Sequence, residues 1–552
     1  MAGEFTVTGP ELSAYAGRWI ALWRGQVAGQ GGTPDQARAA ARAGHYKEKL
    51  TISYVPLGKE LVYSPLLDRI RQAIPTGTTL YLVGGAIRDA LIDRPTHDLD
   101  FVLQGDALKL GRVVADRLGA AYFPLDEERG SARLMLLDEE GARQYLDFTS
   151  MRGPDLEADL SARDFTVNAI AVDIDRPQEL LDPLGGANDV YKKILRPCSP
   201  SAYADDPVRV LRAVRLAASF NFHIPKETRP AMRQAAYNLP RISPERLRDE
   251  IFHILDGQRP SASIRALDML GALPHLFPEV LALKGVEQSA PHHYDVWQHT
   301  LEVIDKLELV FDALSEPHKP EKTANLLTGM VSLQIGRYRL QIANHYRDTL
   351  VPDRSLRGLT FLAALYHDTG KPSTRQVDEH GLAHFFDHEK ISAQYVADRV
   401  SWLRLSNAER SQLELVVLHH PRPFLFANSG KMPSRRAIYR FFRDTGKAGV
   451  DICLLSLADC WATYGLDLPI QVWERQLMVV RRLLEAWWEH PAESVSPPTI
   501  INGYELMNEL HLSPGPRVGR LLEAIREAQA MGSLRTKDEA LAFARTFSLD
   551  EL

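Results

Sequence analysis

The chain has 552 residues, too many for one hydrophobic core, and this length predicts about three to five domains. Its 45% hydrophobic and 25% charged residues are typical of a soluble globular protein, and its net charge of −6 argues weakly against a nucleic-acid partner. No apolar run is long enough to span a bilayer, no signal peptide is recognisable, and three cysteines without a CxxC pair argue against disulfides and a cysteine zinc site. We therefore expect a cytoplasmic protein without a membrane partner.

The first part of the chain, residues 1–60, is expected to form a small accessory domain of mixed α and β structure. Residues 18–23 and 26–28 flank a glycine-containing turn, residues 34–43 are alanine-rich and helical, and residues 50–55 are rich in β formers. This part of the sequence contains no recognisable group of chemically active side chains, so an accessory fold or an interaction module is expected.

Residues 80–103, LYLVGGAIRDALIDRPTHDLDFVL, predict a strand, a tight turn, a helix and a second strand. Gly84 and Gly85 end the first strand and allow a phosphate group to approach the backbone at the start of the helix. Asp98 and Asp100 lie two residues apart on the second strand, so both carboxylates project from the same face. Two such carboxylates repel each other and are tolerated where a divalent cation binds between them.

The combination of these features is more specific than either feature alone. A lone Gly-Gly is usually a turn, and a lone Asp-x-Asp is usually a solvated strand end. In strand–turn–helix–strand order over about twenty residues, they predict a phosphate site next to a metal site, which is what nucleotidyl transfer requires.

The chain continues with a mixed α/β pattern. Residues 109–118 predict an amphipathic helix, and residues 133–137 and 143–148 predict two strands. Asp147, on the second of these strands, is a candidate for a third metal-facing carboxylate, although taken alone it is typical of an ordinary edge residue. The sequences SARDFTVNAI and DPLGGAND follow at residues 161–170 and 182–189.

The composition then becomes helical. The sequence DDPVRVLRAVRLA places Arg209, Arg212 and Arg215 at successive i+3 steps, and so along one side of a helix. This row begins three residues after Asp206. It is either an exposed, salt-bridged face or a row held in a groove, because apolar residues cover most of the remaining circumference. Residues 196–260 hold eleven Lys and Arg against seven Asp and Glu, so a basic patch there could bind RNA phosphates.

Five sequences, GGAIRD, DLD, RDFTVNA, DPLGG and DDPVRVLRAVR, occur in the order and approximate spacing seen in bacterial class II CCA-adding enzymes, which are tRNA nucleotidyltransferases. The resemblance covers roughly residues 61–255, and residues 499–545 are similar to the tail of longer family members. It implies an α/β nucleotidyltransferase head with a mixed sheet, followed by a mainly helical neck and tail. The implied reaction transfers CMP and AMP from CTP and ATP to the 3′ end of tRNA.

The resemblance also implies roles for individual residues. Asp98 and Asp100 would hold two Mg²⁺ ions, with Asp147 as the third catalytic carboxylate. Asp206 and Arg209 would read the base, because one acceptor and one fork of donors complement the polar edges of C or A. The implied nucleotide-binding residues are Gly84, Gly85, Arg88, Asp89, Arg163, Asp164, Asn168, Asp206, Arg209, Arg212 and Arg215.

Comparison with related enzymes bears on specificity. The family usually has two arginines before DFT, whereas here Ala162 precedes Arg163 and leaves one arginine for that role. Bacterial poly(A) polymerases usually carry a GRRF-like signature between the first and third carboxylates. Here FPLDEERGSARLML occupies that interval, so CCA addition is favoured, and residues 126–133 within it predict a flexible loop. An enzyme that adds only CC or only A stays an open alternative.

A second group of histidines and aspartates lies downstream. Its members are His299, His367 with Asp368, His388, His419 with His420, and Asp459, each on a predicted helix among apolar residues. A single histidine of this kind is most often a satisfied core residue. An unpaired polar ring in an apolar helix is unfavourable, however, and convergence on a metal would satisfy all of these groups together.

This second pattern resembles an HD-domain phosphohydrolase. By that resemblance one metal would be bound by His299, His367, Asp368 and Asp459, and a second by His388 and His419 with Asp368 bridging. Lys371 in HDTGK would contact phosphate, and the metal would be Mn, Ni, Co or Fe. Such domains hydrolyse phosphoesters of RNA or nucleotides with a metal-activated water, and the alternative is a degenerate scaffold that kept its ligands.

The expected domains are a small α+β unit at residues 1–60, the head at 61–200, a nucleotide-selecting and RNA-binding neck at 201–285, the HD domain at 286–470 and a tRNA-binding tail at 471–552. Residues 319–354 are expected to be a helical insertion without a readable function. Two rival functions are an HD phosphohydrolase whose head only binds nucleotides, and a non-catalytic RNA-binding module. The carboxylates of the head argue against the first, and both sets of metal-binding candidates argue against the second.

Overall fold

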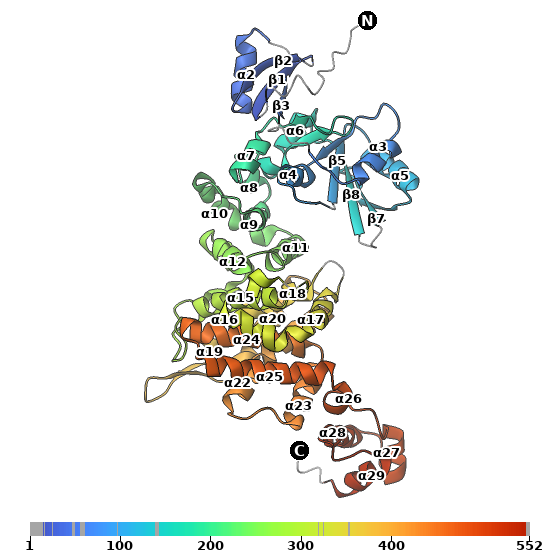
Figure 1. Ribbon diagram of the computed structural model, residues 1–552, viewed down its shortest axis with the longest axis vertical. Helices are drawn as coiled ribbons and strands as arrows, with labels where there is room; N and C mark the ends of the chain where they lie inside the picture. Colours follow the sequence, from blue (N-terminus) through green and yellow to red (C-terminus); the bar gives the residue numbers. More distant parts are fainter. Residues whose placement is uncertain are drawn as a thin grey trace. The chain divides into compact units, whose positions relative to one another are not determined.

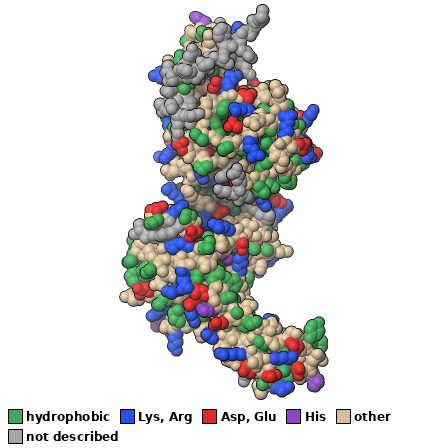
Figure 2. Space-filling view, turned by 45° about the vertical axis from the view of Figure 1, so that its right-hand side comes forward, with side chains coloured by type: hydrophobic (Ala, Val, Ile, Leu, Met, Phe, Trp, Pro, Cys, Tyr) green, Lys and Arg blue, Asp and Glu red, His purple; other side chains and the backbone are tan. Residues whose placement is uncertain are grey.

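The structure is a computed structural model of the chain that describes residue 15 and residues 17–24, 26–46, 50–55, 61–96, 98–138, 143–317, 319–323, 325–351 and 354–547. It divides into two compact units, Met1–Asn238 and Leu239–Leu552 (Figure 1). Among the helices of these residues, none is both long and apolar enough to cross a membrane. Basic and acidic side chains are interspersed on the face shown in Figure 2, so the net negative charge is not gathered into one patch there.

The first unit is organised around one mixed sheet. In spatial order its described strands are β2 (Gln26–Gly31), β1 (Arg18–Trp23), β3 (Thr51–Val55), β10 (Leu180–Leu181), β9 (Ala171–Asp173), β4 (Tyr81–Val83), β5 (Asp98–Leu103), β8 (Arg143–Ser150), β7 (Ser131–Leu137) and β6 (Ala121–Asp126). Strands β5 and β8 run parallel, and the other described pairs are antiparallel. The predicted α/β head with a mixed sheet is confirmed.

The helices of this unit lie between the strands and after them. They are α2 (Pro34–Ala43), α3 (Leu66–Ala73), α4 (Gly85–Leu91), α5 (Ala107–Leu118), α6 (Leu156–Ser161), α7 (Gly186–Lys192), α8 (Ala202–Asp205), α9 (Arg209–Phe220) and α10 (Arg229–Ala236). The arginine-bearing helix α9 therefore belongs to the same compact unit as the sheet.

The N-terminal strands extend the sheet of the head. Strand β3 pairs with β10, where Tyr54 faces Leu180. Helix α2 packs so closely on β2 that a Cβ on Gly29 would lie 2.3 Å from the backbone nitrogen of Ala41. The strands and the helix predicted in this region are confirmed, but the small α+β unit shares its sheet with the head instead of forming a sheet of its own.

Residues 126–133, predicted to form a flexible loop, are part of an antiparallel hairpin, so that prediction is wrong. Strand β6 ends at Asp126 and β7 begins at Ser131, and the two strands pair with each other. Ala132 and Leu134 are fully buried, so alternate residues of β7 hold the hairpin against the core. Only the four residues EERG, 127–130, form the turn, and their composition does not reveal the strands on either side.

Alternation along β5 explains why its two aspartates reach the surface. Leu99 and Phe101 are each 1% exposed, whereas Asp98 and Asp100 are exposed. Phe101 stacks on Phe148 of β8 with ring centroids 5.1 Å apart. Because one face of β5 is fixed in the core, the two aspartates must occupy the other face.

The second unit is almost entirely helical, which confirms the predicted fold class for the neck, HD domain and tail. Its first helices are α11 (Pro244–Leu255), α12 (Pro260–Met269), α13 (Leu273–Leu276), α14 (Pro278–Leu281), α15 (Val296–Ala313), α16 (Leu326–Ile335), α17 (Arg339–Arg347), α18 (Leu356–Tyr366) and α19 (Lys371–Thr374). A hairpin of β11 (Arg375–Val377) and β12 (Ala383–Phe385) follows. The remaining helices are α20 (His388–Trp402), α21 (Asn407–His419), α22 (Pro421–Asn428), α23 (Arg435–Thr445), α24 (Ala448–Tyr464), α25 (Ile470–Trp488), α26 (Pro491–Ser494), α27 (Gly503–Leu510), α28 (Pro516–Ala530) and α29 (Lys537–Thr546).

Helix α24 is the central element of the second unit. It is buried along nearly its whole length and packs on α15 (Figure 1). Helices α16 and α17 occupy the predicted insertion at residues 319–354, so its helical character is confirmed in the described residues. Helices α27, α28 and α29 enclose a separate apolar cluster that includes Leu506, Leu521 and Leu541.

The glycine turn at residues 182–189 fastens α7 to the segment RDFTVNA. The fully buried Asp182 accepts hydrogen bonds from the backbone nitrogens of Gly186 at 2.8 Å and Ala187 at 2.7 Å. Burial raises the pKa of Asp182 to about 7, because these backbone donors only partly replace water. A Cβ on Gly186 would lie 1.9 Å from the carbonyl oxygen of Thr166, so only glycine fits without moving the backbone.

Replacing Gly186 by alanine is therefore expected to destabilise the first unit by about 1–3 kcal/mol, because the new methyl group overlaps backbone atoms. The matched control is Gly111→Ala within α5, where a Cβ would meet its nearest atoms at 3.4 Å, an ordinary contact. Alanine favours a helix interior by up to about 1 kcal/mol over glycine. Urea unfolding measures both effects, and equal stability of the two variants would contradict this account.

Candidate functional site

Three carboxylates come together on one exposed face of the sheet. The parallel pairing of β5 with β8 places Asp100 directly beside Asp147. Neighbouring strands lie about 4.8 Å apart, so these two side chains occupy adjacent positions. Asp98 lies two residues before Asp100 on β5 and shares the same face. The structure thus brings together the three carboxylates that the sequence proposed for a metal site.

Arg133 on β7 completes this group, and sequence reasoning missed it. It is the cross-strand neighbour of Asp147, to which its guanidinium donates from Nε to Oδ1 and from Nη2 to Oδ2, both at 2.8 Å. These hydrogen bonds raise the pKa of Arg133. The bidentate pair fixes the orientation of the Asp147 carboxylate. Only the register of β7 against β8 reveals this contact.

The Asp100 carboxyl lies in an unfavourable electrostatic environment. Although the residue is exposed, the protein around its carboxyl disfavours the charged form, and Asp147 and Asp98 add repulsion, so its pKa is raised to about 6. Arg163 and Arg212 offset part of this effect. A divalent cation between the carboxylates would remove the repulsion. The donor set therefore fits the metal that the family resemblance implies.

Gly84 allows the backbone to pass close to these carboxylates. Its φ is +83°, and a Cβ there would lie 3.3 Å from Oδ2 of Asp100 and 3.5 Å from Nη1 of Arg163. Its amide donates to the carbonyl oxygen of Ile170 at 3.1 Å, which holds the turn in place. Glycine is needed both for the left-handed backbone and for the space beside the carboxylate.

Arg88 and Asp89 of α4 are both buried and hydrogen-bonded to each other, with Arg88 Nε donating to Asp89 at 2.9 Å. Arg88 Nη1 also donates to Oδ1 of Asn168 at 2.7 Å, and Asn168 donates to Oδ1 of Asp164 at 3.3 Å. Burial lowers the pKa of Arg88, whose guanidinium carbon lies 3.9 Å from the ring centroid of Phe220. This network joins the glycine turn to the segment RDFTVNA. Direct contact of these residues with a nucleotide stays a prediction.

The arginine row of α9 is tethered to the sheet unit. Arg209 donates to the carbonyl oxygens of Ala202 at 3.2 Å and Ala162 at 3.0 Å. Arg212 Nη1 lies 3.3 Å from Oδ2 of Asp164, and the Arg212 side chain remains 46% exposed. The two interpretations that the sequence left open each hold in part: Arg209 and Arg215 are half-buried, whereas Arg212 is exposed and forms an ion pair. Ala162, where the family usually has arginine, contributes its carbonyl group, which any residue would supply.

The other predicted nucleotide-binding residues lie on the same elements. Asp206 is half-buried at the end of α8, three residues before the start of α9. Arg215 is also half-buried, and its charge adds to the burial that lowers the pKa of Arg88. Arg163 pairs with Asp159 at 3.2 Å. Asp206, Arg215 and Arg163 therefore belong to the unit that carries the carboxylates.

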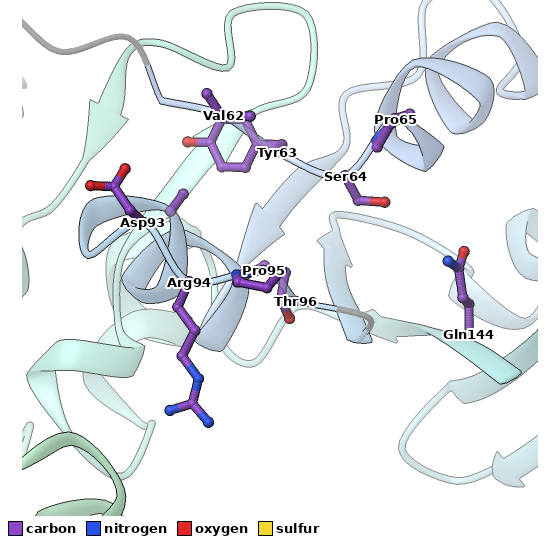
Figure 3. Close-up of a pocket in the computed structure, with 11 residues that line it drawn as sticks. Val62, Tyr63, Ser64, Pro65, Asp93, Arg94, Pro95, Thr96 and Gln144 are labelled. Atoms are coloured by element: carbon purple, nitrogen blue, oxygen red, sulfur yellow. The ribbon is translucent and has the colours of Figure 1, made fainter. Parts of the chain in front are cut away.

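A cavity of about 470 Å³ is lined in part by Ala86 and Ala90 of α4. Figure 3 shows residues 62–65 along one side of this cavity and residues 93–96 along the other. The described residues that line it include neither the three carboxylates nor a predicted nucleotide-binding residue. The cavity is therefore not the candidate metal site, because the three carboxylates lie on the exposed face of the sheet.

A second cluster surrounds Asp368 in the helical unit. Its other members come from separate elements: His299 from α15, His367 from the end of α18, His388 from the start of α20, His420 from the junction of α21 and α22, and Asp459 from α24. The Nε2 atoms of His367 and His299 lie 3.1 Å and 3.6 Å from Oδ2 of Asp368, and those of His388 and His420 lie 3.3 Å and 4.0 Å from Oδ1. Asp459 Oδ1 lies 3.1 Å from Nε2 of His299. Four imidazoles thus surround one carboxylate.

Several candidate ligand atoms of this second cluster are buried without a well-aligned hydrogen bond. Among the described residues, none makes such a bond with either ring nitrogen of His299, with Nε2 of His367 or with Oδ2 of Asp368; their close neighbours are the ionisable groups of the cluster itself and Lys371. Burial alone would raise the pKa of Asp368, but His367 and Lys371 hold it well below its usual range. Burial lowers the pKa of His420 to about 3, which keeps its ring neutral. Buried donors of this kind are satisfied by a metal ion, so the residues fit the divalent metal of an HD domain.

The sequence proposed His419 as a member of this cluster, and the structure corrects this to His420. Consecutive helical residues point about 100° apart, so only one of the two can face Asp368. Nδ1 of His420 lies 2.7 Å from the carbonyl oxygen of Val417, which directs Nε2 toward the cluster. His419 is half-buried at the end of α21, where burial and Arg422 lower its pKa.

His292 also lies at this cluster and was not identified from the sequence. Its ring centroid lies 5.2 Å from that of His299, and burial next to Lys371 lowers its pKa to about 4. The sequence feature that could have identified His292 was the His292-His293 pair, just before the helix predicted around His299. Lys371 Nζ lies 2.7 Å from Oδ2 of Asp368 and donates to Gln288 at 2.7 Å. Its predicted contact with a phosphate stays a prediction.

Four family models match successive parts of the chain. They are described as "Poly A polymerase head domain" at residues 80–196, "Probable RNA and SrmB- binding site of polymerase A" at 221–283, "HD domain" at 296–444 and "tRNA nucleotidyltransferase domain 2 putative" at 478–544. Each matched range lies inside one of the predicted domains, whose own boundaries stay predictions.

Similar proteins of known activity match over most of their length. An A-adding tRNA nucleotidyltransferase of Deinococcus radiodurans is 32% identical over 85% of this chain and 95% of its own. A CC-adding tRNA nucleotidyltransferase of Thermus thermophilus is 31% identical over 84% of this chain and 92% of its own. A multifunctional CCA protein of Pseudomonas paraeruginosa is 39% identical, but over 41% of this chain and 58% of its own.

Solved structures share the fold. A CCA-adding enzyme in apo form I matches with a TM-score of 0.54 and 21% identity, covering 87% of this chain and 92% of that chain. A Thermotoga maritima CCA-adding enzyme complexed with tRNA matches with a TM-score of 0.53 and 20% identity, covering 88% of this chain and 96% of that chain. At these identities the likeness establishes the fold alone.

The raised pKa of Asp100 predicts a pH-dependent effect on stability in the metal-free protein. A carboxyl group whose pKa is about 6 in the folded state and near 4 in the unfolded state destabilises the fold progressively as pH rises from 4 to 6. Asp100→Asn removes this effect, so the variant should have the higher Tm at pH 8 and a similar Tm at pH 4.5. Added Mn²⁺ should raise the Tm of the unchanged protein more than that of the variant. A Tm difference that is the same at both pH values would contradict the assignment.

Proposed function

The chain belongs to the tRNA nucleotidyltransferase family, and from this premise we propose that it transfers CMP and AMP from CTP and ATP to the 3′ end of tRNA. The observation that carries the proposal is the group of three carboxylates beside Gly84, in one compact unit with the arginines of α9. We place the reaction in the cytoplasm, where its proposed substrates meet.

The carboxylates would hold the metal ions of this reaction. We assign two Mg²⁺ ions to Asp98 and Asp100, with Asp147 as the third carboxylate, oriented by Arg133. When bound, the ions would lower the pKa of the RNA 3′-hydroxyl and stabilise the leaving pyrophosphate. The missing Cβ of Gly84 leaves room for the triphosphate beside Asp100.

Side chains of α9 and of the segment between α8 and α9 would select the nucleotide. Arg209, oriented by its bonds to two carbonyl groups, offers donors to a base, and Asp206 offers an acceptor. Together they can complement the polar edges of C or A without a nucleic-acid template. Because α9 lies in the same compact unit as the carboxylates, base reading and chemistry would act on one bound nucleotide.

A second candidate is a divided enzyme that adds CC alone or A alone. The relatives that match over nearly their whole length are named for one of these partial reactions, which favours this alternative. A tRNA ending before CCA and a tRNA ending in CC, each incubated with CTP, with ATP and with both, would separate the candidates by product length. Full extension supports CCA addition, whereas a stop after two C residues or a requirement for the CC end identifies a divided enzyme.

Replacing both Asp98 and Asp100 by alanine is expected to abolish nucleotide addition, because the proposed metal ions lose two of their three carboxylates. Affinity for tRNA should change little, since neither residue is proposed to hold the tRNA body. Labelled CTP incorporation and tRNA binding measure the two effects. Asp175→Ala, which removes an exposed carboxylate outside the cluster, is the control and should keep activity. Continued incorporation by the double variant would refute the assignment.

For the helical unit we propose a metal-dependent phosphohydrolase activity on phosphoesters of RNA or nucleotides. The supporting observation is the set of buried donors around Asp368, whose ligand atoms lie within 4.8 Å of one another in groups of three. Mn, Ni, Co or Fe fits this imidazole and carboxylate set. When bound, such a metal activates a water molecule for attack on phosphorus. Lys371, whose Nζ lies 2.7 Å from Oδ2 of Asp368, would contact a phosphate oxygen of the substrate.

The adjacent histidines provide a matched pair of variants for this second activity. In a background of Asp98→Ala and Asp100→Ala, which removes metal binding by the head, Mn²⁺ should raise the Tm and support phosphoester hydrolysis. His420→Ala is expected to lose both effects, whereas His419→Ala should keep both, because only His420 faces Asp368. If His419→Ala loses the metal response and His420→Ala retains it, the assignment is wrong.

A further inference from the structure

The β11–β12 hairpin carries an exposed aromatic side chain beside the histidine cluster. Phe386, directly after β12, is 66% exposed. His388 follows two residues later and belongs to the cluster. Consecutive Cα atoms are about 3.8 Å apart, so the Cα atoms of these two residues lie within about 7.6 Å of each other. The backbone that carries this exposed ring is therefore close to the proposed site of phosphoester hydrolysis.

His384 stacks against this exposed ring. Its ring is nearly parallel to that of Phe386, with an interplanar angle of 7° and centroids 5.5 Å apart. Nε2 of His384 lies 2.8 Å from Oδ2 of Asp378, and this hydrogen bond lowers the pKa of Asp378. The same carboxylate accepts backbone hydrogen bonds from His380 and Leu382, both at 2.9 Å. The turn thus holds the imidazole parallel to the phenyl ring.

The hairpin is fixed relative to the cluster by contacts through Ser289 and His388. The Ser289 hydroxyl accepts from the backbone nitrogen of Ala383 at 2.6 Å, and the Ser289 carbonyl oxygen lies 3.2 Å from Nδ1 of His292. Nδ1 of His388 lies 2.8 Å from the carbonyl oxygen of Phe385. The aromatic surface and the metal-binding candidates therefore share one rigid local framework.

We propose that His384 and Phe386 form a base-stacking platform for the nucleoside next to the phosphoester that this cluster hydrolyses. The inference rests on the phosphohydrolase function proposed above and identifies what distinguishes its substrate, namely a base attached to the phosphate. Stacking on an aromatic ring is tolerant of sequence because every base has a π face. Phe386 offers no hydrogen-bonding group, so the platform selects for the presence of a base rather than for its identity.

The test compares hydrolysis of adenosine 3′-phosphate and of glycerol phosphate by the full chain with Mn²⁺. Phe386→Ala is expected to raise KM for the nucleotide about tenfold, with kcat and both constants for glycerol phosphate unchanged. Phe386→Trp should retain the low KM, because it preserves the stacking surface. Val377→Ala removes another exposed apolar side chain of the same hairpin, 52% exposed, and should change neither substrate.

Equal changes for both substrates, no change with Phe386→Ala, or the same change with Val377→Ala would overturn the platform. If the unchanged protein hydrolyses neither substrate, the phosphohydrolase proposal fails. The platform is then judged by equilibrium binding of adenosine 3′-phosphate to the unchanged protein and to Phe386→Ala. Equal affinity rejects it, and a weaker affinity of the variant supports it. Nucleotide addition to tRNA should be the same in both proteins, since the hairpin lies outside the unit that carries the carboxylates.

Discussion

The parallel pairing of β5 with β8 forces like charges together, and the head is built around that constraint. It sets Asp100 beside Asp147, with Asp98 on the same face. Apolar partners such as Phe101 and Phe148 fix the opposite face of these strands, so the carboxylates cannot turn away from one another. The resulting repulsion contributes to the raised pKa of Asp100. The packing of the apolar core thus holds together carboxylates whose mutual repulsion is relieved only when a cation binds.

The helical unit also brings together side chains whose arrangement is favourable around a bound cation, here imidazoles around one carboxylate instead of three carboxylates. Asp368 is buried among imidazoles, and several donor atoms there have no hydrogen-bonding partner among the described residues. Such atoms are unfavourable in a closed core and favourable around a metal ion. The long, buried α24 and its packing on α15 supply the rigid frame that brings Asp459 and His299 to the same point. The sheet unit and the helical unit, which have different folds, therefore each hold several candidate metal-binding side chains at one point.

The placement of α9 connects nucleotide selection with the sheet. Arg209 binds the carbonyl group of Ala162, and Arg212 lies beside Asp164, so the helix is joined to the segment that also contains Asn168. Asn168 in turn accepts a hydrogen bond from Arg88 of α4, the helix that follows the glycine turn. Hydrogen bonds and one ion pair to residues 162–168 therefore connect α9 with Arg88, next to the proposed phosphate site. This continuity explains how residues more than a hundred positions apart in the chain can belong to one site.

Local sequence determined the elements and the carboxylates of the head, because alternation along β5 and the glycine turn are short-range patterns that hold wherever the strand is placed. It also identified His299, His367, Asp368, His388 and Asp459, through their mostly apolar surroundings in the sequence and the resemblance to an HD domain. Tertiary structure alone decided that His420 rather than His419 faces Asp368, because the rotation of a helix end depends on its packing. It likewise decided that Arg133 pairs with Asp147 and that β3 joins the sheet at β10, because strand register and strand order are set between segments distant in sequence.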